Sequence, residues 1–416
     1  MAVNHLSGRG KDFCRGCDGA DLFSVLDLGE LPIANELWLA QNEPKEVFPL
    51  HLRICTSCGL GQVEDVVTPA RLFKDYRYLS SMSSVFVEHA HQYALATAAR
   101  LEFGPADWIL EIGSNDGYLL KHFVNLGIKV LGIEPAENVA KIAIAGGVPS
   151  ISKFFGTEVA TALAKEHGFP RLIVANNVMA HVPDIQDFIG GLSKITGPNT
   201  VVSIENPSLI NFLEKGQFDT IYHEHYSYLT AYSVSRIVQN FGLELFDLDK
   251  IPTHGGSNRY WLRAPSPTKA TTQKVAKYIA EELTAGLFDR EAWHRFSENV
   301  KLAITDFRKW LKDSFAQGKK VVGYGAAAKA STLLNSSNIE RDWFKAIADA
   351  SHEKQGRYMP TEGIPIVSPS EMFDLEPTDV VIFPWNIENE LVKLIRDGSK
   401  VESRMWRVIP YLEQIS

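Results

Sequence analysis

The chain has 416 residues, a length that exceeds one ordinary hydrophobic core and predicts two or three domains. Hydrophobic residues make up 45% of it and charged residues 22%, a composition typical of a globular protein. The net charge of −8 offers no basic field, so neither nucleic acid nor a membrane surface is expected as a partner. The sequence has no apolar run of roughly eighteen residues and no apolar segment near its start, which predicts a cytoplasmic protein.

The four cysteines form two Cys-x2-Cys pairs, Cys14 with Cys17 and Cys55 with Cys58. Four thiolates satisfy the tetrahedral coordination that Zn²⁺ adopts in closed structural sites. Two disulfides or two unrelated thiol pairs are the alternatives, although disulfides are rare in a reducing cytosol. We therefore predict a zinc-binding domain over residues 1–70, in which the metal holds the fold together and takes no part in chemistry.

Helix and strand patterns alternate in the middle of the chain. A helical pattern over 83–103 precedes an apolar strand at 108–112, and strands and helices then alternate as far as the strand TVVSIEN. This alternation is typical of βαβ units and a parallel, doubly wound sheet, so the predicted fold class is α/β. We assign this domain to residues 71–245.

The first strand of this domain ends in an acidic loop that contains two glycines, LEIGSNDGYLL. Gly113 and Gly117 lack the third, closely spaced glycine of a dinucleotide fingerprint, so the loop does not favour a pyrophosphate. The residues Glu111, Asn115 and Asp116 instead suit a cofactor that carries a sulfonium and an amino-acid tail.

Two later strand ends complete the predicted cofactor site. Glu134 ends the second strand, where an acid can accept hydrogen bonds from both hydroxyls of a ribose. Asn177 follows the third strand, in VANNVMAHVPD, and is a candidate cofactor contact. The E-x-G-x-x-x-G loop with this acid resembles the class I S-adenosylmethionine methyltransferases, which implies S-adenosylmethionine as the cofactor. The alternative is that the glycines serve only a tight turn between strand and helix.

The segment IYHEHYSYLT, residues 221–230, combines two histidines, a glutamate and three tyrosines. A metal site and a set of core residues are alternatives, but no nearby Asp–His pair completes a ligand set, and Glu224 is unusual on an apolar face. If the segment is extended, Tyr222 and Glu224 share one side and His223 and His225 the other, whereas a turn would let several converge. Methyl transfer to carbon needs a base near neutral pH and a donor to an enolate oxygen, which histidine and tyrosine supply.

The last part of the chain, residues 246–416, contains a long helical stretch and a second α/β pattern. Its loop VVGYGAAAKASTLLN matches a dinucleotide fingerprint only in part, so NAD is not favoured. A helix N-terminus with Lys329 suits the diphosphate of a nucleotide-sugar, and simple packing is the alternative. Further basic residues are candidates for the same contact: Arg259, Lys354 and Arg357.

Seven motifs occur together and in order: CRGCD…CTSCGLGQ, LFKDYRYLSS, EIGSNDG, VMAHVPD, YHEHYSYLT, HGGSNRYW and GYGAAAKASTLLN. Over nearly its whole length the chain thereby resembles the three-domain sugar C-methyltransferases that act on dTDP-linked 4-keto-deoxyhexoses in antibiotic pathways. Within that family it is most similar to the C-3 methyltransferase of the tetronitrose pathway. The resemblance implies methyl transfer from S-adenosylmethionine to C-3 of a dTDP-linked 3-amino-4-keto-2,3,6-trideoxyhexose, with a 3-hydroxy sugar as the alternative substrate.

The resemblance also implies roles for five residues that match its motifs: Tyr76, His181, Tyr222, Glu224 and His225. We assign the removal of the C-3 proton to His225, and the positioning of the sugar and donation to the enolate oxygen to Tyr222 and Tyr76. Glu224 and His181 would orient these groups. Rival interpretations are a dTDP-4-ketosugar oxidoreductase or epimerase, and a zinc-knuckle binding protein with a degenerate methyltransferase fold. The sequence shows no interface signal, so we expect a monomer.

Overall fold

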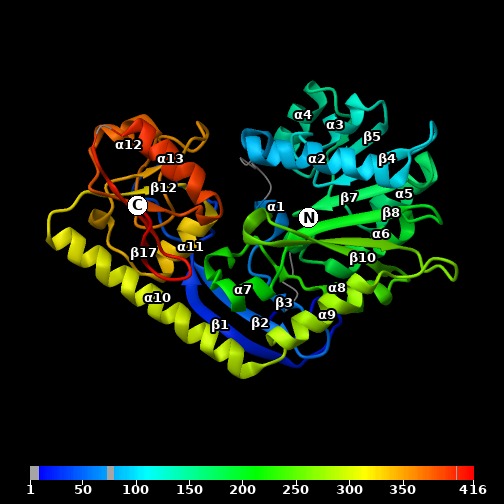
Figure 1. Ribbon diagram of the computed structural model, residues 1–416, viewed down its shortest axis with the longest axis horizontal. Helices are drawn as coiled ribbons and strands as arrows, with labels where there is room; N and C mark the ends of the chain where they lie inside the picture. The colour runs from blue at the N-terminus through cyan, green and yellow to red at the C-terminus, as the bar shows by residue number, and fades with distance from the viewer. Residues whose placement is uncertain (1–8, 73–78, 400) are drawn as a thin grey trace. The chain divides into compact units, whose positions relative to one another are not determined.

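The computed structural model describes residues 9–72, 79–399 and 401–416 and divides into two compact units (Figure 1). Unit 1 consists of the described residues up to Leu22 together with Cys55–Ser208 and Tyr226–Leu287. Unit 2 consists of Phe23–Ile54, Leu209–His225 and Phe288–Ser416. The tyrosine–histidine segment is therefore divided after His225, and the division into three domains stays a prediction. In the described ranges, no helix is both long and apolar enough to cross a membrane.

The described part of unit 1 is built on a seven-stranded sheet with the strand order β10-β11-β8-β7-β4-β5-β6. The strands β4 to β8 in this sheet pair in parallel, as the alternating pattern predicts. Their bounds, with those of the last two strands, are β4 (Trp108–Ile112), β5 (Lys129–Ile133), β6 (Ser150–Ile151), β7 (Leu172–Asn176), β8 (Val201–Pro207), β10 (Glu244–Ile251) and β11 (Ser257–Arg263).

The strand β11 departs from the parallel arrangement because it runs antiparallel to both of its neighbours, β10 and β8. Residues 252–256 form the whole link from β10 to β11, and they include the short 3₁₀ helix η4 (Thr253–Gly255). A link of this length can join antiparallel strands, whereas a parallel pair needs a crossover of roughly a dozen residues or more. The doubly wound sheet therefore ends in a hairpin.

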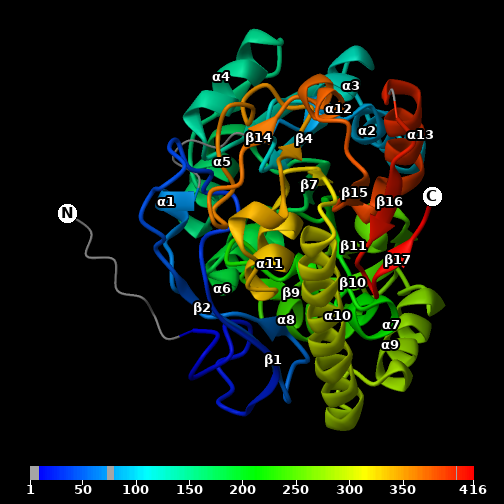
Figure 2. The same cartoon turned by 90° about the vertical axis from the view of Figure 1, so that its left-hand side faces the viewer.

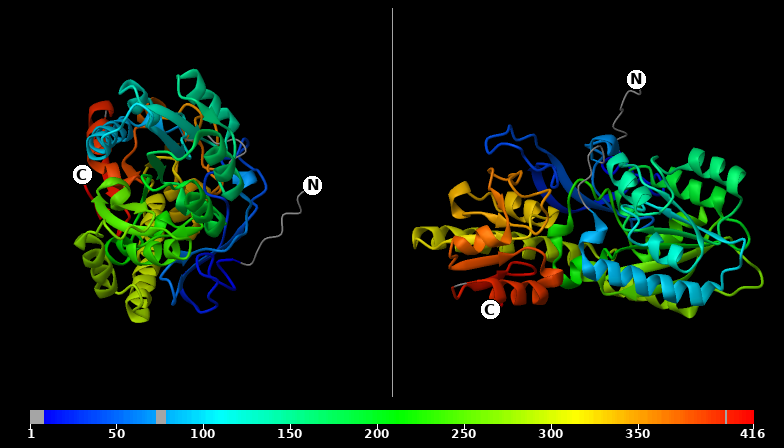
Figure 3. Two further views of the ribbon diagram at one scale, coloured as in Figure 1. Left: turned by 90° about the vertical axis from the view of Figure 1, so that its right-hand side faces the viewer. Right: turned by 90° about the horizontal axis from the view of Figure 1, so that it is seen from above.

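Helices cover both faces of this sheet (Figures 1 and 3). Neighbouring strand residues point to opposite faces, so Ile109 packs with Tyr93 and Phe123, whereas Leu110 packs with Phe188 and Ile237. Both faces are therefore apolar, which explains the continuous apolar strands in the sequence. The first layer contains α2 (Ser84–Leu101), α3 (Leu120–Asn125) and α4 (Glu137–Ala145), and the second α5 (Thr157–His167), α6 (Ile185–Ile195) and α8 (Ala231–Gln239).

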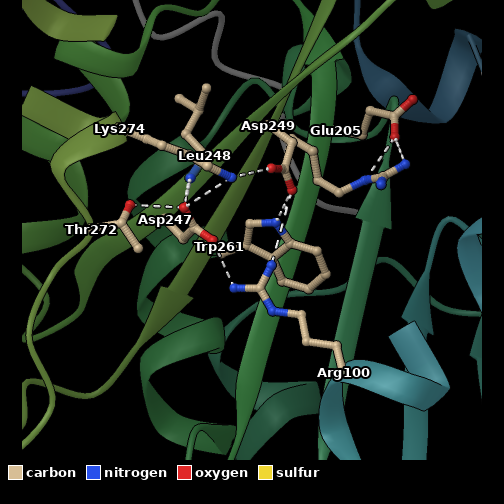
Figure 4. Close-up of polar contacts among 9 residues, drawn as sticks. Arg100, Glu205, Asp247, Leu248, Asp249, Trp261, Thr272 and Lys274 are labelled. Carbon is tan, nitrogen blue, oxygen red and sulfur yellow. Dashed lines mark hydrogen bonds and ion pairs between the residues drawn. The ribbon is translucent and has the colours of Figure 1, made fainter. Parts of the chain in front are cut away.

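Polar side chains tie the hairpin β10–β11 to the helix α2 (Figure 4). Asp247 accepts a hydrogen bond from Arg100 of α2 at 2.8 Å. Asp249 accepts bonds from the indole N–H of Trp261 and from Lys274, each at 2.8 Å. The guanidinium of Arg100 lies 4.2 Å from the centre of the Trp261 ring, so the cation also contacts the aromatic face. These contacts fix the edge of the sheet.

The remaining described elements of unit 1 are short, apart from one helix that packs against α8. Gly61 pairs with Tyr228 and Gln62 with Ser227, which joins β3 to β9 in an antiparallel pair. The bounds are β3 (Gly61–Gln62), α1 (Pro69–Leu72), η1 (Ser80–Met82), η2 (Met179–His181), β9 (Ser227–Tyr228) and α9 (Gln273–Ala285).

The described part of unit 2 contains a six-stranded sheet with the order β14-β13-β12-β15-β16-β17. Its strands pair in parallel except for β17, and helices connect β12 to β13, β14 to β15 and β15 to β16, which confirms the second α/β pattern. The bounds are β12 (Val321–Tyr324), α11 (Ala328–Ser336), η5 (Arg341–Trp343), β13 (Ile347–Ala348), β14 (Ile366–Val367), α12 (Pro369–Asp374), β15 (Asp379–Ile382), η6 (Trp385–Ile387), α13 (Glu388–Gly398), β16 (Arg404–Arg407) and β17 (Glu413–Gln414).

The long helical stretch in the sequence is divided between the units. The helix α9 of unit 1 ends where Gly286 adopts a positive φ of 106°, a conformation that favours glycine at a helix C-terminus. The helix α10 (Arg290–Ala316) of unit 2 is the long helix in Figure 2. It begins at Asp289, whose carboxylate accepts the N–H of Glu291. A stripe of buried residues at helical spacing, including Trp293, fastens α10 to its unit.

Unit 2 also contains most of two strands that lie between the two cysteine pairs and that the sequence patterns did not predict. The strand β1 (Leu22–Leu31) neighbours β2 (Phe48–Cys55) in its sheet. The helix α7 (Ile210–Lys215) and the 3₁₀ helix η3 (Phe218–Thr220) lead from Leu209 to the tyrosine–histidine segment.

Candidate active site

The four cysteine thiols come together in unit 1, with their sulfur atoms all within 4.8 Å of one another. The sulfurs of Cys14 and Cys58 are 3.5 Å apart, and those of Cys17 and Cys55 are 3.6 Å apart. Tetrahedral zinc with Zn–S bonds of about 2.3 Å separates its sulfurs by roughly 3.8 Å, so these residues fit the metal. A disulfide needs about 2.05 Å, so the disulfide alternative does not fit.

The predicted cofactor loop requires glycine at two positions. Gly113 and Gly117 have positive φ angles of 66° and 79°. A Cβ on Gly113 would lie 2.5 Å from Cγ2 of Val178, and a Cβ on Gly117 would lie 2.9 Å from Cγ2 of Val148. Because neither contact is possible for a real side chain, only glycine lets the loop run this close to the neighbouring strand ends.

Glu134 holds the loop in place from the end of β5. One of its carboxylate oxygens accepts the backbone N–H of Asn115 at 3.0 Å, and the other accepts that of Ala136 at 2.9 Å. Burial raises the pKa of Glu134, although these two N–H groups act in the opposite direction. Each carboxylate oxygen keeps a second lone pair, so Glu134 can still accept hydrogen bonds from the two hydroxyls of a ribose.

Acidic groups accumulate around the loop. Glu111 and Asp116 each have one buried oxygen that lacks a hydrogen-bond partner within the described part of the chain. Burial, and then the negative charges of Asp116 and Glu134, raise the pKa of Glu111 well above its ordinary value. A buried acceptor without a partner is costly, and a ligand that carries donors or positive charge would satisfy it. The loop therefore fits the sulfonium and ammonium groups of S-adenosylmethionine better than a phosphate.

The two asparagines of the predicted cofactor site lie at the same edge of the sheet. Asn115 adopts a positive φ of 50°, and its side-chain oxygen accepts the N–H of Ser80 at 2.9 Å. Asn177 also adopts a positive φ, 56°, directly after β7, and its N–H donates to the carbonyl of Glu205 at 2.6 Å. Carboxyl ends of parallel strands form the ligand edge of such sheets, so both residues occupy positions suited to a cofactor.

In unit 2, Tyr222 and His225 form a hydrogen-bonded pair. A turn brings them together, because the N–H of His225 donates to the carbonyl of Tyr222 at 2.9 Å. The Tyr222 hydroxyl lies 2.8 Å from Nε2 of His225, and Nδ1 of His225 lies 3.1 Å from the carbonyl of Thr220. A carbonyl can only accept, so Nδ1 carries the proton, and in the neutral imidazole Nε2 is left to accept from Tyr222. This arrangement turns a basic lone pair toward a phenol.

The two residues between them point elsewhere. Glu224 is buried, and one of its oxygens accepts both the backbone and side-chain N–H groups of Asn35, each at 3.1 Å. His223 is also buried, and its Nε2 lies 3.2 Å from the carbonyl of Phe48. Burial lowers the pKa of His223 to about 4, so this ring stays neutral and donates to Phe48. Glu224 and His223 therefore fasten the turn to the residues around β1 and β2.

Of the other two predicted catalytic residues, the structure describes one. His181 is half-buried at the end of η2 in unit 1, and η2 packs against β9 and the end of β8. Tyr76 lies outside the described residues. Among the described catalytic candidates, the structure therefore pairs Tyr222 with His225.

A buried ionic group at the end of β8 was not predicted. Glu205 accepts two hydrogen bonds from Arg259, at 2.7 and 3.1 Å, and lies 3.0 Å from Nε2 of His89. Burial alone would raise the pKa of Glu205, but His89 and Arg259 lower it to about 2. Arg259, a candidate phosphate contact in the sequence, is thus bound to a carboxylate. His89 and Glu205 are 116 positions apart in the chain, and Arg259 and Glu205 are 54 apart, so no local pattern could have indicated the group.

The second glycine loop, in unit 2, is surrounded by lysines. Lys329, in the first turn of α11, donates to the side chain of Asn386 at 2.8 Å and lies 3.9 Å from the Trp385 ring centre. Burial lowers the pKa of Lys329 to about 8. Lys354 donates to the carbonyl of Ala326 at 2.9 Å and to Asp349 at 3.1 Å. Arg357, the remaining basic candidate, donates to the carbonyl of Glu353.

Comparison with known proteins places this geometry in a family. Three family profiles match consecutive parts of the chain: a zinc binding domain over residues 14–73, a methyltransferase domain over 86–248, and a C-methyltransferase C-terminal domain over 252–410. The chain is 30% identical over 383 residues to the C-methyltransferase NovU of Streptomyces niveus, an alignment that covers 92% of this chain and 91% of NovU. The chain belongs to this C-methyltransferase family.

Among solved structures, part of this chain is similar to most of the chain of two enzymes. The CcbJ methyltransferase from Streptomyces caelestis matches 42% of this chain and 90% of its own, with 14% identity and a TM-score of 0.34. The magnesium protoporphyrin IX methyltransferase ChlM from Synechocystis PCC 6803 with bound SAM matches 47% of this chain and 89% of its own, with 14% identity and a TM-score of 0.33.

The cofactors of this C-methyltransferase are S-adenosylmethionine and zinc. The acidic glycine loop lies in the part of the chain that matches the methyltransferase domain, and the four-cysteine cluster lies in the part that matches the zinc binding domain. S-adenosylmethionine supplies an electrophilic methyl group on its sulfonium. Zinc has four protein ligands here, which leaves no open coordination position for a reacting group.

Proposed function

We propose that this C-methyltransferase transfers the methyl group to C-3 of a dTDP-linked 3-amino-4-keto-2,3,6-trideoxyhexose, as a step of deoxysugar biosynthesis for an antibiotic. The observation that carries the proposal is the Tyr222–His225 pair, in which the phenol oxygen lies 2.8 Å from Nε2 of the imidazole. A methyltransferase for oxygen or nitrogen needs little more than one base, whereas carbon must first lose a proton. The same chemistry on a 3-hydroxy sugar is the alternative.

The ketone at C-4 makes the hydrogen at C-3 acidic, so deprotonation gives an enolate whose carbon attacks the methyl group. His225 is the proposed base, because its Nδ1–H bond to Thr220 leaves the lone pair on Nε2. In this structure the Tyr222 hydroxyl lies 2.8 Å from Nε2, the atom that carries that lone pair. When the sugar binds, the hydroxyl must turn to the enolate oxygen, which leaves the Nε2 lone pair free to take the C-3 proton.

Three further residues have supporting roles in the proposal. Glu224, bound to Asn35, holds the turn on which Tyr222 and His225 lie. His181 keeps the orienting role that the resemblance implies, and Tyr76 helps to position the sugar.

The domain of residues 246–416 grips the nucleotide in this proposal. The support is the second glycine loop, where Lys329 stands in the first turn of α11 and Lys354 bonds to the loop carbonyl of Ala326. Cations beside a helix N-terminus favour a diphosphate. The proposal includes a zinc-binding domain over residues 1–70, a methyltransferase domain over 71–245, a cytoplasmic location and a monomeric chain.

Deuterium exchange separates proton removal from methyl transfer. The protein is incubated in D2O with S-adenosylhomocysteine and the 4-keto sugar nucleotide, and deuterium at C-3 is followed by mass spectrometry. We expect His225→Asn to slow exchange by about 100-fold or more, the usual contribution of a general base, and Tyr222→Phe to slow it by about 10-fold. Full exchange in His225→Asn would exclude His225 as the base.

The matched control is His352→Asn, which makes the same substitution at an exposed histidine of unit 2 that bonds to Gln355. This variant should exchange at the wild-type rate. The rate of methyl transfer to the 3-amino and 3-hydroxy sugars then distinguishes the substrates. A higher kcat/KM for the 3-hydroxy sugar would replace the proposed substrate with the alternative.

A further inference from the structure

Arg15 is a fully buried arginine between two zinc ligands, Cys14 and Cys17. Its guanidinium pairs with Asp65 at 2.7 Å, and the centre of the Tyr226 ring lies 5.4 Å from its carbon Cζ. Its backbone N–H donates to the side chain of Gln62 at 3.0 Å. A cation is therefore enclosed at the base of the first cysteine pair, within unit 1.

The guanidinium of Arg15 also binds two carbonyls from distant parts of the chain. One nitrogen donates to the carbonyl of Pro183 at 3.1 Å, two residues after His181, and another donates to the carbonyl of Val63. The N–H of Val63 in turn donates to the carbonyl of Tyr226, the residue that follows His225 in the chain. Arg15 thus joins the segment that contains His181 to the start of the strand β9.

Two other contacts attach the first cysteine pair to the same segment. Arg9 forms an ion pair with Asp184 at 2.7 Å, and Asp18 accepts a hydrogen bond from Gln186 at 2.9 Å. With the bond to Pro183, three side chains from residues 9–18 bind residues 183–186. On the other side, the β3–β9 pairing and the bond from the Tyr226 hydroxyl to the carbonyl of Val67 hold residues 226–228.

Stability is a weak reason for a buried arginine here. The guanidinium is fully buried and has the carboxylate of Asp65 beside it, and a charge is costly to enclose even when it is paired. Well-packed apolar residues often serve a fold as well as a buried ion pair does. A guanidinium, however, has five donors in a rigid fork and can fix several carbonyls at once. An apolar residue cannot do this.

We propose that Arg15 is a positioning residue for the methyl-transfer reaction, through which the zinc-binding knuckle fixes residues 181–183 and 226–228. The knuckle acts on the reaction by holding these segments, and zinc itself stays outside the chemistry. The effect on activity rests on the proposed function, whereas the effect on the two segments does not.

The first test is amide hydrogen exchange of the zinc-loaded protein, compared with Arg15→Met. We expect exchange to rise by about 10-fold or more in peptides that contain residues 179–187 and 226–230, as local opening requires, and to stay unchanged in peptides of β4 and β5. Zinc content, measured with a colorimetric chelator, should remain at the wild-type value. Unchanged exchange in both segments would overturn the proposal.

The second test is kinetic. We expect Arg15→Met to lower kcat by about 20-fold while KM for S-adenosylmethionine changes less than about twofold. A small displacement of the reacting groups slows the reaction, whereas it leaves the binding of the cofactor almost unchanged. Unchanged kcat together with faster exchange would leave the structural coupling and exclude an effect of Arg15 on the reaction. Unchanged exchange together with lower kcat would overturn the proposed coupling between the knuckle and the two segments and leave the proposed function as it stands.

A double variant separates positioning from loss of stability. Arg15→Met removes the cation beside the Asp65 carboxylate, whose side chain is only 10% exposed. The double variant Arg15→Met with Asp65→Leu also removes that carboxylate and should recover the thermal midpoint. If the proposal holds, exchange and kcat stay altered in the double variant. Recovery of both would show that Arg15 acts only through stability. The matched control is Lys11→Gln, which removes an exposed cation of the same knuckle and should change neither property.

Discussion

Two glycine loops, one in each unit, form an equivalent backbone hydrogen bond to a neighbouring strand. In unit 1, the N–H of Gly113 donates to the carbonyl of Ile133 at 2.7 Å. In unit 2, the N–H of Gly325 donates to the carbonyl of Ala348, also at 2.7 Å. In both cases the acceptor is the last residue of the neighbouring parallel strand. Each glycine has a positive φ, so each loop turns in the same way after its strand.

The two loops are also alike in that an acidic residue follows the neighbouring strand, Glu134 after β5 and Asp349 after β13. Asp349 accepts the N–H of Ala326 at 2.9 Å and that of Ser351 at 2.9 Å. In unit 1, Glu134 accepts the loop N–H of Asn115 and an N–H two residues further along the chain. A carboxylate therefore closes each loop from the second strand.

The side chains around the two loops carry opposite charge. Glu111 and Asp116 accompany Glu134 in unit 1, whereas Lys354 bonds to Asp349 in unit 2. Backbone geometry alone thus does not decide the ligand. Neighbouring charge does, and it favours a sulfonium at the first loop. At the second loop, an anion is what the proposed function expects beside Lys354 and Lys329.

Gly113→Ala should abolish cofactor binding without affecting the second loop. The new Cβ would lie 2.5 Å from Val178 at a φ of 66°, so overpacking and backbone strain together cost about 4 kcal/mol, or roughly a thousandfold in affinity. Calorimetry with S-adenosylhomocysteine measures this loss, and dTDP binding should not change. Gly127→Ala is the control, because Gly127 has a similar φ of 76° but open space around it. An equal loss in both variants would contradict the clash.

The turn of unit 2 should be sensitive to acid through His223. Its pKa is about 4 in the folded protein against an ordinary 6.5, so protonation favours the unfolded state. Stability therefore falls as the pH decreases from 6.5 to 4, by up to about 3 kcal/mol. Urea unfolding of the wild type and of His223→Gln at several pH values measures the difference between them. That difference should shrink toward pH 4, and a constant difference would rule out this titration.

Glu134→Gln should weaken cofactor binding more than it weakens the fold. The amide replaces one charged acceptor, so a ribose hydroxyl and one loop N–H lose a strong partner, at about 2 kcal/mol or roughly 30-fold in affinity. The matched variant is Asp349→Asn at the other loop, which should leave S-adenosylhomocysteine affinity unchanged. If both variants bind S-adenosylhomocysteine equally well, the first loop does not depend on its acid.

Lys354→Met should have the smallest effect, and only on the nucleotide. Loss of one cation near a phosphate reduces dTDP affinity by about 10-fold at low salt and lowers its dependence on salt. S-adenosylhomocysteine binding should stay the same. The control is Lys345→Met, which removes an exposed lysine of the same unit that precedes the strand β13. Equal dTDP affinity in wild type and Lys354→Met would show that the second loop does not use this cation.

Strands, turns and ligand spacings that involve residues close together in the chain could be predicted from the sequence. The apolar run at 108–112 coincides with β4, and the glycine loop after it has the acid Glu134 where the pattern placed it. The two Cys-x2-Cys pairs meet in one cluster. Strand periodicity, turn chemistry and ligand spacing are encoded in short stretches, so they can be predicted without the fold.

Contacts between residues far apart in the chain became known only from the tertiary structure. The sequence left open whether the segment at 221–230 is extended or turned, and the turn pairs Tyr222 with His225 while Glu224 binds Asn35. The contacts of Arg15 with Pro183 span 168 positions. Such contacts arise from the packing of whole layers, which minimises unpaired buried polar groups over the entire chain, and no local pattern records that outcome.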